Sequence, residues 1–361
     1  CELIQRLLMK MRWIMLISIF GMMQIIACQV ACPDGWFGPK CQFQCHCQTK
    51  CDSTGECDEN LCSVGWFGYK CQYQDFVSRF EVQDPDPQRQ LSRWSKGDDS
   101  DCTEDTSIKL VEIYLKKPFL FTWISLTVKN PELLRKFSIT LVSNWKKWDC
   151  KQTITSIVKN TVNIRCEKRE YVKKIILTGD GVHSLCTIHV SNGRNMALKR
   201  PVTTDLNEVI TGLTAIGDGN TDTNLAGSCT AINDVNMLPS TSWSLSFEEP
   251  VLASSYTIIS KGNYTGQGDL IVDFYGRNKN VITIMKDSYN AQLYSYDHTE
   301  PTWGLKITYK QTDSSSLNFS LCQISVFGEC VPGRWGLDCK NSCGSECRVS
   351  CNESDGTCPI D

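Results

Sequence analysis

The chain has 361 residues and a formal net charge of −3, so its overall charge gives no reason to expect nucleic acid as a partner. Its 22 cysteines are far more than an ordinary cytosolic protein carries, which indicates a disulfide framework made in an oxidising compartment. The length exceeds what one ordinary hydrophobic core holds, so we expect about two to four modules.

The N-terminal segment has the pattern of a secretory signal peptide. Lys10 and Arg12 precede an apolar run from Trp13 to Ala27, and small or polar residues follow. The alternative, an uncleaved anchor, has an apolar run that is short for a bilayer and is interrupted by Gln24. We therefore interpret residues 1–28 as upstream residues and a signal peptide, and we expect a secreted protein or one on the extracellular face of the plasma membrane.

The ends of the sequence leave a further alternative open. Cys1 precedes any methionine, and Asp361 lies inside a cysteine-rich repeat. The chain is therefore also interpretable as a fragment of a longer protein that attaches to a membrane through a missing segment.

A short cysteine-bounded pattern occurs three times, twice near the start and once near the end. It reads CPDGWFGPKC at Cys32–Cys41, CSVGWFGYKC at Cys62–Cys71 and, more loosely, CVPGRWGLDC at Cys330–Cys339. Glycine allows a tight turn, the aromatic residues can pack on a disulfide, and the disulfide replaces the core that so small a unit cannot build. Zinc is the alternative, because Cys45-His46-Cys47 with Cys51 could supply ligands, but paired cysteines in a secreted chain favour disulfides.

These residues resemble the EGF-like repeats of multiple-EGF scavenger and engulfment receptors, whose hallmark is the G-W-x-G loop. The resemblance assigns repeats to residues 29–74 and a truncated repeat to 330–361, where Cys343, Cys347, Cys351 and Cys358 look like the start of a further unit. The bonds that it implies are Cys32–Cys41, Cys45–Cys51, Cys47–Cys57, Cys62–Cys71 and Cys330–Cys339.

An internal duplication organises the rest of the chain. Residues 111–120 and 243–252 share an alternating strand pattern, two charges, a proline and an apolar restart, and strand-like alternation follows at 121–128 and 256–259. An upstream and a downstream cysteine flank each copy at similar spacing. We expect two homologous β-domains at 75–190 and 191–329. We predict two disulfides that close long loops, Cys102–Cys186 and Cys229–Cys322, each stabilising the fold by about 3–5 kcal/mol. A third, Cys150–Cys166, is predicted within a hairpin.

The second β-domain resembles the fucolectins, which belong to the discoidin-like, galactose-binding-domain-like jelly-roll class. The first domain resembles them more faintly, through its cysteines and Leu185-Cys186. This resemblance predicts a mainly β fold, with two tandem discoidin-like jelly-roll β-sandwiches flanked by small disulfide-rich repeats. The matching stretches are 195–202, Asp218-Gly219-Asn220, Gly227-Ser228-Cys229 and Leu321–Val326.

The same resemblance implies a calcium site in the second domain. Calcium prefers six or more hard oxygen ligands, and a backbone carbonyl near Ala215 would add to the side chains. A glutamine stands where the family has a glutamate, so charge is lost; the alternative is a turn whose Asp and Asn bond their own backbone. The first domain has Thr187 at the equivalent position and is not expected to bind calcium. The implied ligands are Asp218, Asn220, Ser228 and Gln323.

The sugar-binding pattern of the family is not kept. Ala231 stands at the histidine position, Lys261-Gly262-Asn263 replaces Arg-x-Asp, and Tyr264-Thr265 replaces the adjacent cysteines. Ordinary fucose binding is therefore not expected, and the positions that a different ligand would meet are Ala231, Lys261, Asn263 and Tyr264. Three N-glycosylation sequons begin at Asn263, Asn318 and Asn352.

Domain one is rich in cations between residues 135 and 174, and Trp145 and Trp148 flank Lys146-Lys147. Such a face could hold sulfated glycans or anionic headgroups, and the alternative is a set of outward-facing strand positions. None of the four histidines lies in a recognised catalytic motif, so no enzyme and no organic cofactor is expected.

The sequence thus predicts a non-enzymatic extracellular recognition or adhesion protein, resembling a scavenger-receptor ectodomain. Its expected partner is a cell-surface protein, a glycan or an anionic surface, bound through the β-sandwiches. The alternatives are a divergent calcium-dependent carbohydrate-binding lectin and the ectodomain fragment of a signalling receptor.

Overall fold

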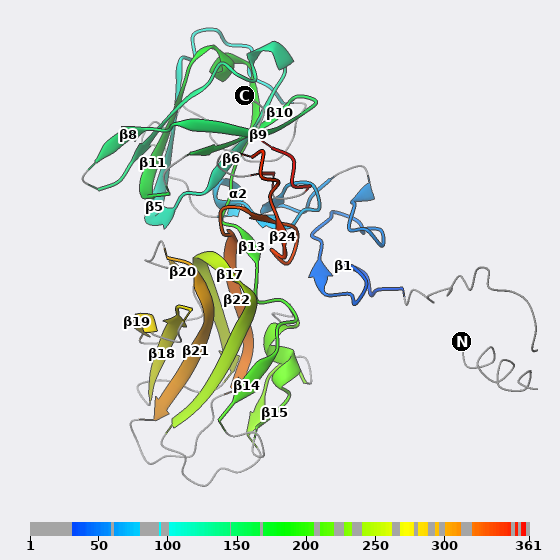
Figure 1. Ribbon diagram of the computed structural model, residues 1–361. Helices are drawn as coiled ribbons and strands as arrows, with labels where there is room; N and C mark the ends of the chain where they lie inside the picture. The colour runs from blue at the N-terminus through cyan, green and yellow to red at the C-terminus, as the bar shows by residue number, and fades with distance from the viewer. Residues whose placement is uncertain are drawn as a thin grey trace, which may run out of the picture.

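The computed structural model places two β-sandwich modules end to end, with small disulfide-bonded repeats beside the region where they meet (Figure 1). The predicted signal peptide, together with Asn220, Asn263, Tyr264 and Asn318, lies outside the described residues. The residues described are 31–58, 61–79, 94, 101–144, 146–166, 169–205, 210–219, 227–232, 240–261, 268–277, 281–287, 293–295, 300–311, 320–347, 351–352 and 355–358.

The first module packs two antiparallel four-stranded sheets face to face. One sheet has the order β12-β6-β10-β9, with bounds Leu185–Val190, Trp123–Val128, Thr161–Cys166 and Gln152–Val158. The other has the order β5-β11-β7-β8, with bounds Leu110–Leu120, Tyr171–Thr178, Ser138–Val142 and Lys147–Asp149. Two 3-10 turns, η2 at Pro131–Leu133 and η3 at Asp180–Ser184, close one end.

Alternation of apolar and polar residues explains this packing. In β10, Val162, Ile164 and Cys166 are buried while the residues between them are only partly buried, so one face of the strand points into the core. Strand β6 is buried along its whole length, because it runs through the middle of its sheet. The resulting core is one continuous cluster of apolar side chains between the two sheets.

The second module is a larger antiparallel assembly built on β22 and β17. Its path runs β13-β22-β17-β21-β18-β19, with bounds Arg194–Asn195, Ser320–Cys330, Ser240–Lys261, Thr302–Gln311, Gly268–Tyr275 and Val281–Asp287. Strands β14 and β20, at Val202–Thr204 and Leu293–Ser295, also pair with β17. A separate ribbon pairs β15, Ile210–Thr211, with β16, Ala231–Ile232, and η4 spans Leu213–Gly217.

The duplication seen in the sequence has a structural counterpart. Cys102 is bonded to Cys186 and Cys229 to Cys322, and in each case the residue after the first cysteine donates its N–H to the carbonyl before the second. These hydrogen bonds are Thr103 to Leu185 at 2.8 Å and Thr230 to Leu321 at 2.9 Å. Both modules therefore fasten an upstream loop to a late strand in the same way.

The two prolines of the repeated pattern do not end their strands. In the repeated pattern a proline stands between two apolar stretches, and β5 continues through Pro118 as β17 does through Pro250. The pairing of each strand shifts register nearby, between Val172 and Lys174 opposite β5 and between Ser246 and Val251 of β17. A β-bulge accommodates proline, which has no N–H to donate to the neighbouring strand, so each strand continues past its proline.

The small repeats contribute only two-residue hairpins and rely on disulfides. Their strand pairs are β1 with β2, β3 with β4 and β23 with β24, at Trp36–Phe37, Phe43–Gln44, Trp66–Phe67, Tyr73–Gln74, Arg334–Trp335 and Asn341–Ser342; the short helix α2 follows at Phe76–Arg79. The described residues hold ten disulfides. Their pairs are Cys32–Cys41, Cys45–Cys51, Cys47–Cys57, Cys62–Cys71, Cys102–Cys186, Cys150–Cys166, Cys229–Cys322, Cys330–Cys339, Cys343–Cys351 and Cys347–Cys358.

A buried polar junction joins the two sandwiches. Glu329, at the end of β22, is fully buried and receives a 2.8 Å ion pair from Arg165 of the first module. Its other oxygen accepts hydrogen bonds from Thr122 at 2.8 Å and from Ser191 at 3.0 Å. A buried carboxylate needs such complete pairing, because an unpaired charge in a protein interior is costly.

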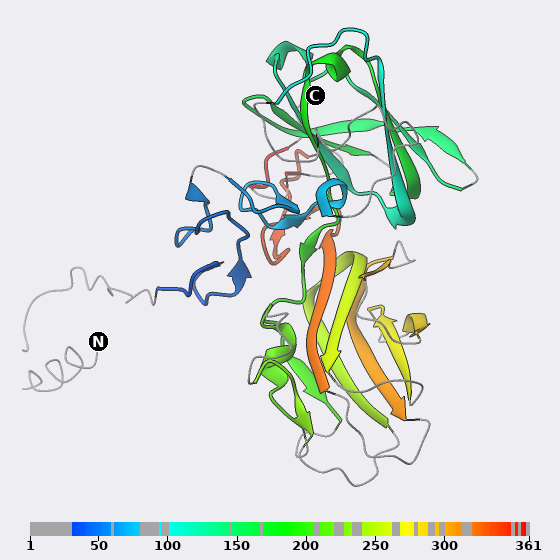
Figure 2. The same cartoon turned by 180° about the vertical axis from the view of Figure 1, so that it is seen from behind.

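The segment between the modules also binds the second small repeat. Asn192 is fully buried, and its N–H donates to the Gln74 carbonyl while Gln74 donates its own N–H to Gly193. The buried Asp75 carboxylate accepts bonds from the Val190 N–H and from the His189 ring. The view from behind shows the early and late repeats on the same side of the region where the sandwiches meet (Figure 2).

The predicted mainly β fold is confirmed: the protein has two tandem β-sandwich modules and small disulfide-rich repeats. So many disulfides are typical of an extracellular protein. Over the part of the chain that the structure describes, no helix is both long enough and apolar enough to span a membrane.

Removing Arg165 should destabilise the whole junction. Arg165→Gln leaves the Glu329 carboxylate buried without its cation, and we expect the free energy of unfolding to fall by about 3–5 kcal/mol in chemical denaturation. Lys340→Gln breaks an ion pair with Glu248 whose side chains are about half exposed, and should cost less than about 1 kcal/mol. Equal losses in the two variants would contradict a special role for the buried pair.

Candidate functional site

The predicted calcium loop begins with a tight turn in the second module. Gly212 is left-handed and precedes η4, and the Asp218 N–H donates to the Ala215 carbonyl at 3.3 Å. Gly219 is also left-handed, at φ +78°, which favours glycine there. These turns bring residues 215–219 against β22, the strand that carries Gln323.

Gln323 is fully buried, and protein groups engage both ends of its amide. Its Oε1 accepts the Gly219 N–H at 3.2 Å, and its Nε2 donates to the Ile324 carbonyl at 3.0 Å. Ser228 is buried beside the Cys229–Cys322 disulfide, with its hydroxyl 3.7 Å from the Cys229 sulfur. The Gln323 amide thus holds the loop against β22 by a direct hydrogen bond, with no metal ion needed between them.

The donor set does not fit a calcium cage well. Calcium is held by free carboxylate, amide and carbonyl oxygens, and the Gln323 oxygen already accepts a backbone hydrogen bond. Asn220 lies outside the described residues. Calcium at this loop stays a prediction, and we derive no chemistry through it.

The first small repeat covers this loop from outside. A Cβ on Gly219 would lie 2.9 Å from the Gln44 side-chain oxygen and 3.4 Å from the Trp36 ring. Lys199 donates its backbone N–H to the Gly217 carbonyl at 2.7 Å and places its ammonium over the Trp36 ring at 4.4 Å. The outer side of the loop at Gly219 is therefore covered by residues of the same chain.

The predicted sugar-binding positions are only partly described. Ala231 pairs with Thr211 in the β15–β16 ribbon, and Lys261 is exposed at the end of β17, opposite Ser320. Asn263 and Tyr264 lie outside the described residues, as does the sequon residue Asn318. Asn352 is half-buried and donates its backbone N–H to the Thr357 carbonyl at 2.7 Å, so that sequon begins in a turn of the last repeat.

The zinc alternative does not survive the disulfide pattern. Cys45, Cys47 and Cys51 all lie in disulfides, which leaves no thiolate among them to bind a metal. His46 instead stacks on Trp66, with ring centroids 3.4 Å apart, and its Nδ1 lies 3.1 Å from the Cys71 carbonyl oxygen. This histidine packs the first two repeats together.

A basic edge forms on the first module where β8 turns toward β9. Lys146, Lys147 and Lys151 are all exposed, and β8 is the outer strand of its sheet, paired only with β7. The Cys150–Cys166 disulfide connects the end of β8 to the end of β10 and so fastens one sheet to the other at this point. We call Lys146, Lys147 and Lys151 the basic edge.

A small hollow of about 150 Å³ lies beside the basic edge. Its lining combines two lysines, the Trp148 indole, the disulfide and the acidic Asp149 and Glu170. Asp149 accepts a 2.8 Å hydrogen bond from Thr140, so one of its two oxygens is already engaged by the sheet. A cationic rim next to an indole is suited to an anionic group, although the hollow itself is small.

Two cations that the sequence assigned to the basic region have structural roles instead. Arg165 points into the junction and binds Glu329. Lys174 binds Glu112 at 2.8 Å and Tyr114 at 2.9 Å; burial opposes its charge, but these partners prevail and raise its pKa. The sequence alone could not distinguish these two cations from the exposed lysines. Alternation shows which face of a strand a residue is on, but it does not show which residue from another strand pairs with it.

The comparisons with known proteins give only distant likenesses. No family model matches the sequence, and no curated protein does. Similar solved structures include the lectin domain of lectinolysin complexed with Lewis B antigen, at 16% identity and TM-score 0.31 over 37% of this chain and 96% of that one. A fucose-binding module of Streptococcus pneumoniae is 18% identical, at TM-score 0.30 over 38% of this chain and 96% of that one.

The f-lectin from striped bass (Morone saxatilis) serum is 15% identical at TM-score 0.30, and this match covers 72% of the present chain and 99% of the lectin. At these identities and TM-scores, the ligands of these proteins say nothing about the ligand of this chain. The function must therefore be argued from the chain's own residues.

Loss of the Gln323 amide should loosen the 215–219 loop. In Gln323→Ala, the Gly219 N–H loses its acceptor, and we expect an unfolding free energy lower by about 1–3 kcal/mol with faster hydrogen exchange at Gly219. The exposed Gln48→Ala is the matched control and should leave both quantities unchanged. Unchanged exchange at Gly219 in the Gln323 variant would show that the amide does not hold the loop.

Proposed function

We propose that this chain is a non-enzymatic extracellular recognition protein that holds a polyanionic ligand, such as a sulfated glycan chain, against the basic edge of its first sandwich. The observation that carries the proposal is the set of exposed lysines on and beside β8, set next to Trp148 and a disulfide that fixes the strand end. Grouped cations on a rigid edge raise the local concentration of an anion and hold it.

Edge lysines also have a simpler explanation. Sheets often carry lysine on an outer strand because its charge prevents pairing with another chain. The binding proposal differs in one respect that can be measured: it requires the lysines to act together on one ligand. Lys159 and Lys173 are also exposed on this module and would extend the same positive field.

The broader assignment follows from the disulfides. We propose that the protein acts outside the cell, either secreted or on the plasma-membrane surface, and takes part in adhesion or scavenger-type binding. A divergent calcium-dependent lectin is a second proposal, ranked lower because the Gln323 amide is already engaged by the Gly219 N–H. The ectodomain of a signalling receptor is a third. A rise in melting temperature on adding calcium, lost in Asp218→Asn, would favour the lectin.

Binding to immobilised heparin should depend on the basic edge. We expect the triple variant Lys146→Gln, Lys147→Gln, Lys151→Gln to bind at least tenfold more weakly at physiological salt, and wild-type binding to weaken steeply as salt rises. The triple variant Lys40→Gln, Lys50→Gln, Lys310→Gln removes the same charge from exposed positions outside the basic edge and is the matched control.

Comparable affinity of the two triple variants would contradict the proposal, since net charge alone would then explain the binding. Absence of any heparin binding by the folded wild-type chain would contradict it as well. The measurement is surface plasmon resonance over a salt series, with circular dichroism to verify that each variant is folded.

A further inference from the structure

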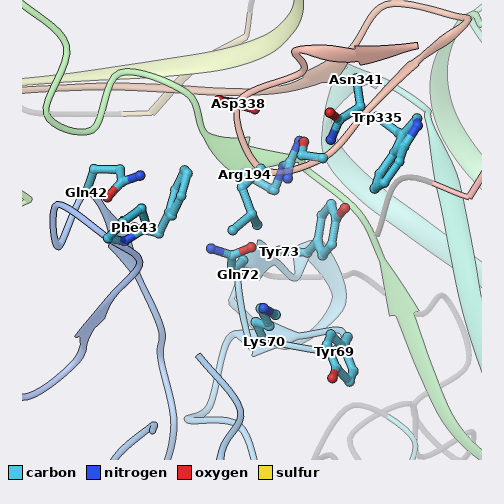
Figure 3. A pocket seen from close by; sticks show the side chains of 13 residues that line it. Gln42, Phe43, Tyr69, Lys70, Gln72, Tyr73, Arg194, Trp335, Asp338 and Asn341 are labelled. Carbon is cyan, nitrogen blue, oxygen red and sulfur yellow. The ribbon is translucent and has the colours of Figure 1, made fainter. Parts of the chain in front are cut away.

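A cleft lies among the small repeats and not in a sandwich. It has a volume of about 390 Å³, within the roughly 300–1,000 Å³ typical of small-molecule sites. Three repeats and the inter-module segment line it, and Figure 3 shows side chains from these separate segments around one space. The chain must therefore bring residues near 40 and near 340 together to form it.

The same turn forms three walls of this cleft. In each repeat a left-handed glycine, Gly38, Gly68 or Gly336, precedes a cysteine that is also left-handed and donates its N–H back to that glycine. The residues inside and just after these turns face the cleft. They are Pro39, Gln42 and Phe43 from the first repeat, Tyr69, Lys70, Gln72 and Tyr73 from the second, and Leu337, Asp338 and Asn341 from the last.

Two cations contribute to the lining. Arg194 comes from β13, is 95% buried at 5% exposure, and donates one guanidinium N–H to the Gly336 carbonyl at 2.9 Å, while its Nε has no hydrogen-bond partner among the described residues. Lys70 is half-buried, and burial lowers its pKa. Its ammonium donates to the Thr54 carbonyl at 2.5 Å and lies over the Phe37 and Tyr69 rings. The hydrogen bonds of both cations go to neutral groups, and desolvated cations of this kind gain from an added anion.

The only carboxylate in the lining already has a partner. Asp338 forms an ion pair with Lys340 at 3.3 Å, and Lys340 also binds Glu248 on the second sandwich. Glu56 lies near Lys70 but accepts the Tyr69 hydroxyl. The lining therefore has an excess of positive charge.

The remaining lining is aromatic and amide in character. Phe43, Tyr69, Tyr73 and Trp335 offer ring surfaces, and Gln42, Gln72 and Asn341 offer amide donors and acceptors. A sugar ring has apolar C–H faces that rest on aromatic rings and hydroxyl groups that hydrogen-bond with amides. Aromatic rings thus supply contact area while the amides fix orientation.

We propose that this cleft binds one carboxylated pyranose, a hexuronate or a nonulosonate, with its carboxylate toward Lys70 and Arg194. The ring lies against the aromatic side chains, and its hydroxyls meet the amides of Gln72 and Asn341. This site is separate from the basic edge, which belongs to the first sandwich, so neither proposal depends on the other.

Isothermal titration calorimetry on the full chain, with intact disulfides, tests the proposal. The probes are glucuronate and N-acetylneuraminate, with galactose as the uncharged comparison. We expect one of the two acids to bind with at least tenfold higher affinity than galactose, and the identity of that acid distinguishes a hexuronate from a nonulosonate ligand. Lys70→Gln should weaken its binding at least tenfold.

Lys40→Gln is the matched control, because Lys40 occupies the equivalent position of the first repeat's turn, is exposed, and does not line the cleft. It should bind the acid as the wild type does. The basic-edge triple variant should also bind it normally, which separates this proposal from heparin binding. No binding by folded wild-type protein, equal binding of galactose, or an unaffected Lys70→Gln variant would overturn it.

Discussion

The buried Glu329 carboxylate is the interaction on which the arrangement of modules depends. It ends the last strand of the second sandwich, yet it is satisfied by Arg165, Thr122 and Ser191, all of which belong to the first sandwich or the segment between the modules. A buried charge of this kind stabilises little in itself, because desolvation offsets most of the attraction. Its effect is specificity: any other relative placement of the sandwiches would leave the carboxylate unpaired.

This junction also explains why the small repeats pack where they do. Asp75 connects the second repeat to the junction, because its carboxylate binds the Val190 N–H and the His189 ring. Arg194 connects the last repeat, because its guanidinium donates to the Gly336 carbonyl. Repeats that are far apart in sequence thereby meet, and their equivalent turns surround one cleft. Disulfides stabilise each repeat internally, but the polar junction decides which repeats become neighbours.

Much of this could be predicted from local patterns. Alternation and the duplicated cysteine spacing predicted two β-sandwiches, because period-2 burial and long-range bonds leave a visible pattern in the sequence. The cysteine pairs around the G-W-x-G loops followed from the resemblance to EGF-like repeats, and the structure has the same pairs. Alternation alone did not show that the strands continue through Pro118 and Pro250, since a bulge that allows a strand to continue has no clear local signal.

The candidate sites were less predictable, because their partners are distant in sequence. Nothing near Arg165 indicates that its partner is Glu329, and nothing near Arg194 indicates that it lines a cleft with Lys70 and Asn341. The sequence indicated a loop near residue 218 and left open whether it holds calcium or is a plain turn. The hydrogen bond from the Gly219 N–H to Gln323 could be seen only in the three-dimensional structure.

Differential scanning calorimetry of the disulfide-intact chain tests the central claim that the junction makes the sandwiches and repeats one unit. The account predicts a single cooperative transition whose calorimetric and van't Hoff enthalpies agree, because opening either sandwich exposes the other side of the Glu329 network. Two separate transitions, each matching an isolated sandwich, would contradict it.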